Sequence, residues 1–445
     1  MKNSILILLF ASTFQHLNAQ VLDSTFGVLG SFIPGVLNFY GTTACDFEGR
    51  DDQAFSAIHL SDGRIILAGY TRGADGNDFA IARLLPDGMF DETLGTEGKV
   101  RIDLGYQNDS CLAAALYQSD RVLMGGCATP PGTVKYVNLI TRVDLDGKPD
   151  PNFGNNGHTT IDLPSAHEMI AKILPQSDGK IIVLGHALYG QSFYSPDSTA
   201  VYIGRLLPDG QVDSAFGSDG FVYLRWKQEC NASLLGDAIL DSNGRILLTG
   251  GAYHPYPLVF DGKFTNWHNI IVCRFLPGGE PDTSFGTNGK REFPYTGAGY
   301  GTALHIYDDG RILLAGVVGN VSPFPFYTFL ARLMPDGAPD LSFANNGHFN
   351  KYIVGGGAGS EPVGILRIQN KIILGIVDAP MGDHVTFGAL CLEENGKVDS
   401  TFGQNGVFIY YKGFFSMYFI NQIGSTEPAS FFLSGYYRVL EPYNM

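Results

Sequence analysis

The chain has 445 residues, of which 29 are Lys or Arg and 44 are Asp or Glu, so its formal net charge is −15 at pH 7. A surface of this sign repels phosphate backbones, which argues against nucleic acid as a partner. The chain holds 57 glycines, 31 phenylalanines and only 16% charged residues, a composition that indicates a turn-rich, strand-rich folded protein and excludes a disordered one.

Residues 1–19 have the three zones of a cleaved secretory signal. Lys2 precedes the apolar run 5–10, and the segment ends in Ala19. We expect cleavage before Gln20, which leaves 445 − 19 = 426 residues with 28 basic and 44 acidic side chains, a charge of −16. No later segment offers the roughly 18 consecutive apolar residues of a transmembrane helix. We therefore expect an exported bacterial protein, without a transmembrane segment, in the periplasm, on the cell surface or in the medium.

Residues 20–445 are expected to form one domain, because they repeat the motif Asp-x-x-Phe-Gly-x-x-Gly. The aromatic position changes only once, to Leu94. Successive copies start 58 to 69 residues apart, at Asp23, Asp91, Asp150, Asp213, Asp282, Asp340 and Asp399. A recurring unit of this length predicts a repeat architecture and overrides the two or three domains that length alone suggests.

The period-two alternation and the turn residues of each unit predict four antiparallel strands. The Asp62-Gly63 pair suits the two-residue hairpin between the second and third strands. Examples of the four strands, from first to last, are residues 99–104, 57–60, 64–69 and 79–84. One such sheet cannot bury both of its faces, so the units must stack, and we predict an all-β, seven-bladed β-propeller.

The last unit departs from this pattern, because the Arg-Leu-x-Pro-Asp-Gly segment that closes the other units is missing. The N-terminus begins almost at Asp23 and has little to contribute. We therefore expect an incomplete seventh blade, with three strands or with a weak outer strand from residues 438–445.

These motifs resemble a known family. The Asp-x-x-Phe-Gly-x-x-Gly motif is followed by Asp-Gly-Lys/Arg-Ile-Ile/Leu-Leu-Ala-Gly and by Arg-Leu-x-Pro-Asp-Gly. This combination, over residues 20–435, is similar to the delta-60 repeat family of exported bacterial proteins. The resemblance implies a propeller-like fold and carries neither an activity nor a ligand.

A conserved spacing within the chain suggests how the blades are joined. An arginine stands eight residues before the repeat aspartate in five units, at Arg83, Arg142, Arg205, Arg274 and Arg332, and the sixth place holds Cys391. A guanidinium fork matches a carboxylate in two hydrogen bonds. We expect each arginine to pair with an aspartate near the next inner strand and to fix a blade junction.

A search for chemistry finds no catalytic residue, metal site or cofactor motif. His167-Glu168 begins like a zinc-protease helix, but Ala171 stands where the second histidine is required. The acidic pairs Asp51-Asp52 and Asp308-Asp309 are interpreted as solvated turn residues.

The cysteines show no CxxC spacing. Cys111 and Cys127 flank a predicted hairpin, where either a disulfide or, preferably, two buried thiols are expected.

The informative irregularity is an aromatic-rich connection between the third and fourth strands of the fourth unit. Both tryptophans of the chain belong to this region, and in an up-and-down blade their connections share one rim. The candidate ligand-binding residues are Trp226, Tyr253, His254, Tyr256, Trp267 and His268. Exposed aromatic side chains suit sugar faces and protein hot spots. The alternative is that these loops bury their own rings as a satellite core.

The sequence therefore predicts a noncatalytic, monomeric binding scaffold whose ligand is a glycan or a protein. The alternative function is a lyase or hydrolase that acts on polysaccharide at the propeller channel. Fold alone does not decide between them.

Overall fold

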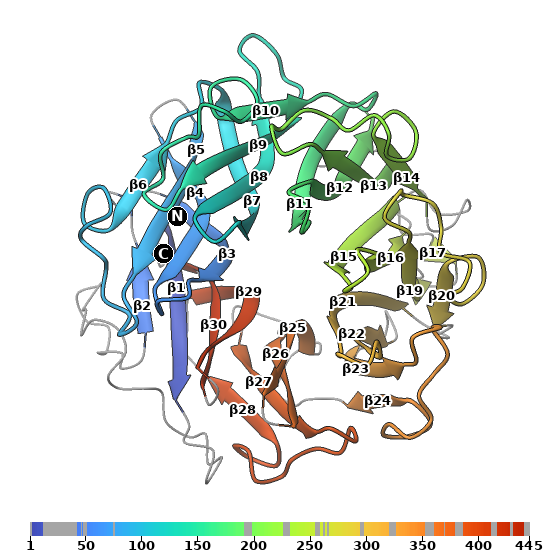
Figure 1. Cartoon of the computed structure of the whole chain (residues 1–445). Helices are drawn as coiled ribbons and strands as arrows, with labels where there is room; N and C mark the ends of the chain where they lie inside the picture. Colours follow the sequence, from blue (N-terminus) through green and yellow to red (C-terminus); the bar gives the residue numbers. More distant parts are fainter. Residues whose placement is uncertain are drawn as a thin grey trace.

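The computed structural model is built from β-strands (Figure 1), and no helix occurs among the residues that it describes. Accordingly, nothing in this part of the chain forms a helix long and apolar enough to cross a bilayer. The described residues are 2–11, 42–45, 47, 51–73, 76–190, 198–225, 232–253, 259–260, 263–264, 267–293, 298–319, 326–351, 360–368, 370–378, 386–410, 416–427 and 430–439.

Six four-stranded antiparallel sheets follow one another from Asp52 to Tyr410 around a ring (Figure 1). The strands of the first sheet are β3 (Asp52–His59), β4 (Ile65–Arg72), β5 (Asn77–Leu84) and β6 (Lys99–Ile102). The second holds β7 (Gln107–Tyr117), β8 (Arg121–Thr129), β9 (Val137–Asp144) and β10 (His158–Ile161). The third holds β11 (His167–Pro175), β12 (Ile181–Tyr189), β13 (Ser198–Leu206) and β14 (Phe221–Leu224).

The remaining three sheets repeat this order. The fourth holds β15 (Ala232–Leu240), β16 (Ile246–Tyr253), β19 (Trp267–Phe275) and β20 (Lys290–Phe293). The fifth holds β21 (Ala298–Ile306), β22 (Ile312–Gly319), β23 (Phe326–Leu333) and β24 (His348–Lys351). The sixth holds β25 (Ser360–Ile368), β26 (Lys371–Asp378), β27 (Thr386–Glu393) and β28 (Val407–Tyr410). One parallel pair, Thr199 with Ala232, joins the third and fourth sheets, and a small hairpin of β17 (Val259–Phe260) and β18 (Lys263–Phe264) lies between β16 and β19 in the chain.

A further sheet combines the two ends of the chain. Its order is β2 (Thr42–Cys45), β1 (Lys2–Ala11), β30 (Ser430–Val439) and β29 (Ser416–Glu427). Residues 2–11 enter this sheet in the full-length chain, whereas the expectation of a small N-terminal contribution concerned the chain that remains after residue 19. Arg438 pairs inside β30, and residues 440–445 of the expected outer strand lie outside the described residues. Removal of residues 1–19 would remove β1, and this cleavage stays a prediction.

The boundaries of the sequence repeat do not coincide with the boundaries of the sheets. The strand after each Asp-x-x-Phe-Gly turn was expected to open its own unit, yet β6 pairs with β5 as the outermost strand of the preceding sheet. The turn folds the chain back alongside β5, the strand that precedes it. In this turn the Asp91 N–H donates to the Arg83 carbonyl (2.9 Å). The innermost strands β3, β7, β11, β15, β21, β25 and β29 contact one another around the axis (Figure 1).

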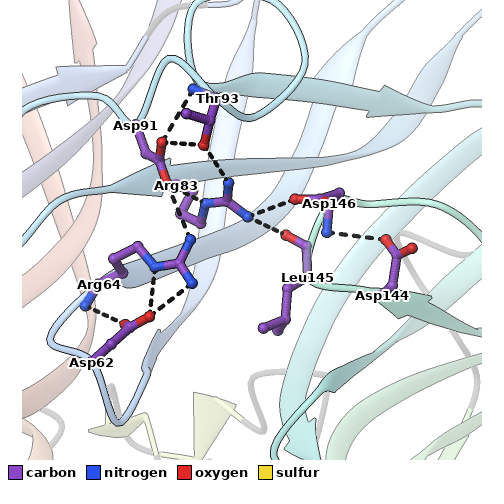
Figure 2. Close-up of polar contacts among 8 residues, drawn as sticks. All are labelled: Asp62, Arg64, Arg83, Asp91, Thr93, Asp144, Leu145 and Asp146. Carbon is purple, nitrogen blue, oxygen red and sulfur yellow. Dashed lines mark hydrogen bonds and ion pairs between the residues drawn. The ribbon is translucent and has the colours of Figure 1, made fainter.

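The junction between the first and second sheets is held by the buried Arg83 of β5 (Figure 2). Its Nε donates to Oδ2 of Asp91 (2.7 Å), and its Nη1 donates to the carbonyl of Leu145 (2.8 Å) in the turn that follows β9. Arg64, at the start of β4, brings a second cation to Asp91 (3.2 Å). Burial alone raises the pKa of Asp91, but the Thr93 hydroxyl and these arginines outweigh it and hold that pKa well below its usual value.

The next four junctions repeat this arrangement. Their arginines donate Nε to the repeat aspartate at 2.7 to 2.9 Å and Nη1 to a carbonyl of the following sheet. The expected Arg–Asp pairing is confirmed, but the two-bond fork is wrong, because the second arm crosses to the next sheet. The aspartate also lies in the turn between the two outer strands and not near an inner strand. At the sixth place, Cys391 replaces the arginine and Lys371 alone pairs with Asp399 (2.8 Å).

The motif phenylalanine completes four of these junctions. Phe153, Phe216, Phe285 and Phe343 are fully buried. Their ring centroids lie 4.7 to 4.9 Å from the arginine guanidinium carbons. On the other side they meet glycines of the next sheet at φ of +82° to +97°, where a Cβ would lie 2.8 to 3.0 Å from a ring atom: Gly210, Gly279, Gly337 and Gly396. The glycine that ends each of these four turns is therefore required by both its φ and this close approach.

The described cysteines are packing residues. Cys45, Cys111, Cys127, Cys273 and Cys391 are buried. Cys111 faces Gly126 in the ladder, one residue away from Cys127. The preferred interpretation of buried thiols is thus confirmed for this pair, and the disulfide is absent.

Candidate functional site

The channel along the ring axis is shaped by a β-bulge at the same place in the innermost strand of each of the six sheets between Asp52 and Tyr410. A bulge adds one unpaired residue and redirects its neighbours. The six inserted residues are Phe55, Leu112, Ala171, Gly236, Thr302 and Val363. All six line a cavity of about 600 Å³. The inserted positions are mostly apolar, whereas neighbouring positions bring polar and charged side chains to the cavity.

One ion pair crosses this wall. Lys172 Nζ of β11 lies 2.6 Å from Asp237 Oδ1 of β15. Asp237 also accepts the backbone N–H groups of Ala238 (2.8 Å) and, through Oδ2, of Leu304 in β21 (2.9 Å). These bonds tie three sheets together and leave the carboxylate with a saturated, ionic environment.

A second carboxyl group in the channel has the opposite environment. Burial raises the pKa of Glu361, and the hydrogen bond with Tyr300 only partly opposes that rise. Burial and the neighbouring carboxyl also raise the pKa of Tyr300 far above its usual value. Glu361 and Asp237 both reach β21, so two carboxyl groups with different hydrogen-bond partners share one cavity.

Three further acids occupy one repeated position at the start of an innermost strand. These acids are Asp52, Asp109 and Glu168, and all three are fully buried. Each stands three residues before the inserted residue of the β-bulge in its strand. Asp52 accepts the N–H of Phe47 (2.8 Å), and Glu168 accepts that of Leu163 (2.9 Å), in both cases five residues earlier. Asp52 is thus a structural acid, and its interpretation as a solvated turn residue is wrong.

Asp109 differs from its two counterparts, because both of its carboxylate oxygens are buried without a hydrogen-bond partner. Burial, together with Asp78 and Asp103, raises the pKa of Asp109 to about 8, and the nearby N–H of Leu104 opposes this only weakly. A neutral carboxyl group therefore lies in the first junction at pH 7.

The predicted aromatic site falls largely outside the described residues. Trp226, His254 and Tyr256 lie outside them altogether, and only the backbone is described for Tyr253, Trp267 and His268. These three are strand residues at the ends of β16 and β19, and not loop residues as expected. The ladder places Tyr253 directly opposite Trp267. The structure thus brings two of the six predicted positions together.

The sequence analysis missed the channel residues Lys172, Asp237, Tyr300 and Glu361. Alignment of the repeats on the bulge offers a signal for the first two, since the position after the bulge is Lys172 in one repeat and Asp237 in the next. Among the described residues, no group of three His, Cys, Asp or Glu side chains converges as a metal site.

Comparison with known proteins supports the repeat architecture. A family model described as a β-propeller domain of unknown function, DUF5122, matches residues 60–94, 176–216 and 308–343. Each matched segment contains one hairpin turn and one junction aspartate, so the match follows the elements that join the sheets. The chain is therefore a β-propeller repeat protein. No curated protein matches it.

Several solved structures are weakly similar to the chain. A protein of unknown function from Dyadobacter fermentans is 14% identical, with a TM-score of 0.42 over 77% of this chain and 94% of that one. The β-propeller domain of the Trilobed protease from Pyrococcus furiosus, with an open velcro topology, is 10% identical, with a TM-score of 0.38 over 84% and 88%. The α-L-arabinofuranosidase Arb93A from Fusarium graminearum is 12% identical, with a TM-score of 0.40 over 77% and 93%.

Proposed function

We propose that the chain is a seven-bladed propeller of the delta-60 type in which β29 and β30 of the terminal sheet, which remain after cleavage, belong to the seventh blade. Its strand β29 contacts both β25 of the sixth sheet and β3 of the first, which is the place of a missing blade in the ring (Figure 1). We further propose export after cleavage before Gln20 and a monomeric mature protein. N-terminal sequencing of the exported protein and its sedimentation mass test both statements.

The function we propose is noncatalytic binding of a glycan or protein at the rim where the aromatic residues gather. The observation that carries it is the pairing of Tyr253 with Trp267, because it places two aromatic positions opposite each other where β16 ends and β19 begins. By the alternation of strand directions, β14 ends and β15 begins at the same end of the sheets as this pair, and Trp226 lies between the two strands in the sequence. Aromatic groups at a rim suit the flat faces of sugars.

A glycan array and pull-downs with insoluble polysaccharides test this function. The mature protein is compared with its Trp226→Ala and Trp267→Ala variants, after circular dichroism has shown that both fold. Binding that is lost in both variants supports the aromatic rim as a sugar site. Binding that both variants retain, or no binding to any glycan, overturns it.

The channel carboxyl groups favour one second candidate, hydrolysis or lysis of a polysaccharide. Acid–base catalysis of glycoside cleavage uses two carboxyl groups, one of them a proton donor. The cavity holds Glu361, whose pKa is raised by burial, and Asp237, which pairs with Lys172. Release of reducing ends by the wild type, lost in Glu361→Gln, would support this candidate. The three donors around Asp237 favour the structural role instead.

A further inference from the structure

The N-terminal strand β1 fills the third position of the terminal sheet. The order β29, β30, β1 and β2 matches the order β3, β4, β5 and β6 of the first sheet position by position, so β1 stands where β5 stands. Every residue of β1, from Lys2 to Ala11, pairs with β30, and residues 5–8 pair with β2 on the other side. Among the described strands, β1 is therefore the one that joins β2 to the rest of this sheet.

The third strands of the neighbouring sheets are buried on both faces. In β5, β9 and β13 all residues are buried except one partly buried residue at an end of each strand: Asn77, Asp144 and Ser198. Alternate residues of a strand belong to opposite faces, so a strand at this position has to be mainly apolar in both sets. Residues 5–10 of β1, Ile-Leu-Ile-Leu-Leu-Phe, are apolar throughout. This run therefore suits a third strand as well as the core of a secretory signal.

The strands on either side of β1 are held by contacts that do not depend on it. On one side, Cys45 of β2 and the nearby Phe47 belong to one buried apolar cluster with Ala80 and Leu84 of β5. The Phe47 N–H also donates to Asp52 at the start of β3 (2.8 Å). On the other side, β30 pairs with β29 along its second edge. Loss of residues 1–19 therefore leaves β2 and β30 anchored, with a strand position open between them.

The first sheet supplies an apolar floor for this position. Alternation divides β4 between two clusters: Ile66 and Ala68 pack toward the second sheet, whereas Ile65 and Leu67 belong to the cluster that contains β2. The strand β1 contacts β3 of the same sheet. Without β1, the edge of β30 loses its hydrogen-bond partners, and apolar surface of the first sheet meets water. An unpaired edge above an apolar surface is a template for another strand.

We propose that the mature protein binds an extended apolar strand of another protein at this position, antiparallel to β30 and beside β2. The two edges supply main-chain hydrogen bonds, as in other cases of strand addition, and burial of both faces selects for an apolar run without proline. Residues 5–10 show the chemistry that fits, because they occupy the position in the full-length chain. The inference rests on the proposed cleavage before Gln20 and is independent of glycan binding.

Fluorescence anisotropy with a synthetic peptide of residues 2–11 tests the proposal. The peptide carries a fluorescein label and a C-terminal lysine tail for solubility. It should bind residues 20–445 and should not bind the full chain of residues 1–445, in which β1 already occupies the position. Circular dichroism first shows that both proteins fold.

A second peptide with Leu6→Pro and Leu8→Pro is the matched control. It stays apolar and has the same lysine tail, so attraction of that tail to the acidic protein is the same for both peptides. It lacks two backbone N–H groups, and proline does not fit the middle of a sheet. We expect it to bind residues 20–445 at least roughly tenfold more weakly.

Hydrogen exchange locates the bound peptide. Backbone N–H groups in the middle strand of an antiparallel sheet alternate between its two neighbours. About half of the amides of β30 should therefore exchange faster in residues 20–445 than in the full chain, and they should slow when the peptide binds. The ladder between β26 and β27 of the sixth sheet is the control and should not change. Peptide binding without protection of β30 overturns the assigned position.

The remaining outcomes separate the docking site from the cleavage on which it rests. No peptide binding to residues 20–445, or equal binding of both peptides, overturns the site while the cleavage stands. A dimer of residues 20–445 that the peptide dissociates identifies a second copy as the occupant and overturns the choice of another protein. N-terminal sequencing that finds residues 1–19 on the exported protein overturns the cleavage, and with it an open position in that protein.

Discussion

Replacement of Asp109 by Asn should stabilise the protein at neutral pH. The folded-state pKa of Asp109 is raised from 3.8 to about 8, so the folded protein holds a proton that the unfolded chain releases above pH 4. The contribution of Asp109 to the free energy of unfolding is therefore most favourable below pH 4, and it is lost as the pH rises toward 8. Over the roughly three pH units from 3.8 to 7 the loss is about 4 kcal/mol, at 1.36 kcal/mol per unit. Asparagine carries no such penalty, because it does not ionise.

The assay is urea unfolding of wild type and Asp109→Asn at pH 5, 6, 7 and 8. The difference between the two proteins cancels the other titrating groups, Glu168 and Glu361 among them. We expect the difference in unfolding free energy between the two proteins to grow by about 1.4 kcal/mol per pH unit. Asp103→Asn is the matched control, since it removes one like charge near Asp109 and should flatten the wild-type slope only partly. Parallel pH profiles for wild type and Asp109→Asn would refute the reasoning.

Three further predictions concern the junctions and the thiols. Arg274→Ala leaves the buried Asp282 without its closest cation and should cost about 3–5 kcal/mol in urea unfolding, whereas a cost below 1 kcal/mol would contradict a role in the junction. Gly337→Ala pushes a methyl group toward the Phe285 ring at a positive φ and should cost about 2 kcal/mol by the same measurement; no loss would contradict the close approach. Cys111 and Cys127 are buried with thiol pKa values of about 12, so a maleimide reagent should label them only after unfolding, and labelling of the native protein would show that they are accessible.

The repeat motif predicted the junctions better than it predicted the sheets. The spacing from Arg83 to Asp91 identified a contact that the structure contains, because both residues belong to one local turn. The assignment of the following strand failed, since only the pairing of β6 with β5 shows on which side of the turn the strand lies. Motif spacing fixes what is close along the chain, whereas strand partners depend on the stacking of the sheets.

The candidate sites illustrate the same limit. The aromatic-rich segment drew attention to Trp226 and Trp267, because two tryptophans close together can be recognised from a sequence alone. The channel pair of Lys172 and Asp237 and the lone carboxyl of Asp109 were missed, because their character depends on burial and on neighbours 65 residues away or in another strand. A sequence shows which groups can ionise, and it does not show what surrounds them.

The offset between repeat and sheet has a consequence for how such a ring changes size. The repeat that begins at Asp150 carries Phe153 at its start and Gly210 near its end, and these two residues meet across a single junction. One repeat therefore encodes a complete interface, together with parts of the two sheets on either side. A tandem duplication of one repeat would insert a sheet and a matching interface at once, and the neighbouring sheets would meet surfaces that they already fit. Gene duplication and loss can thus alter the circumference of the ring without new side-chain complementarity having to evolve.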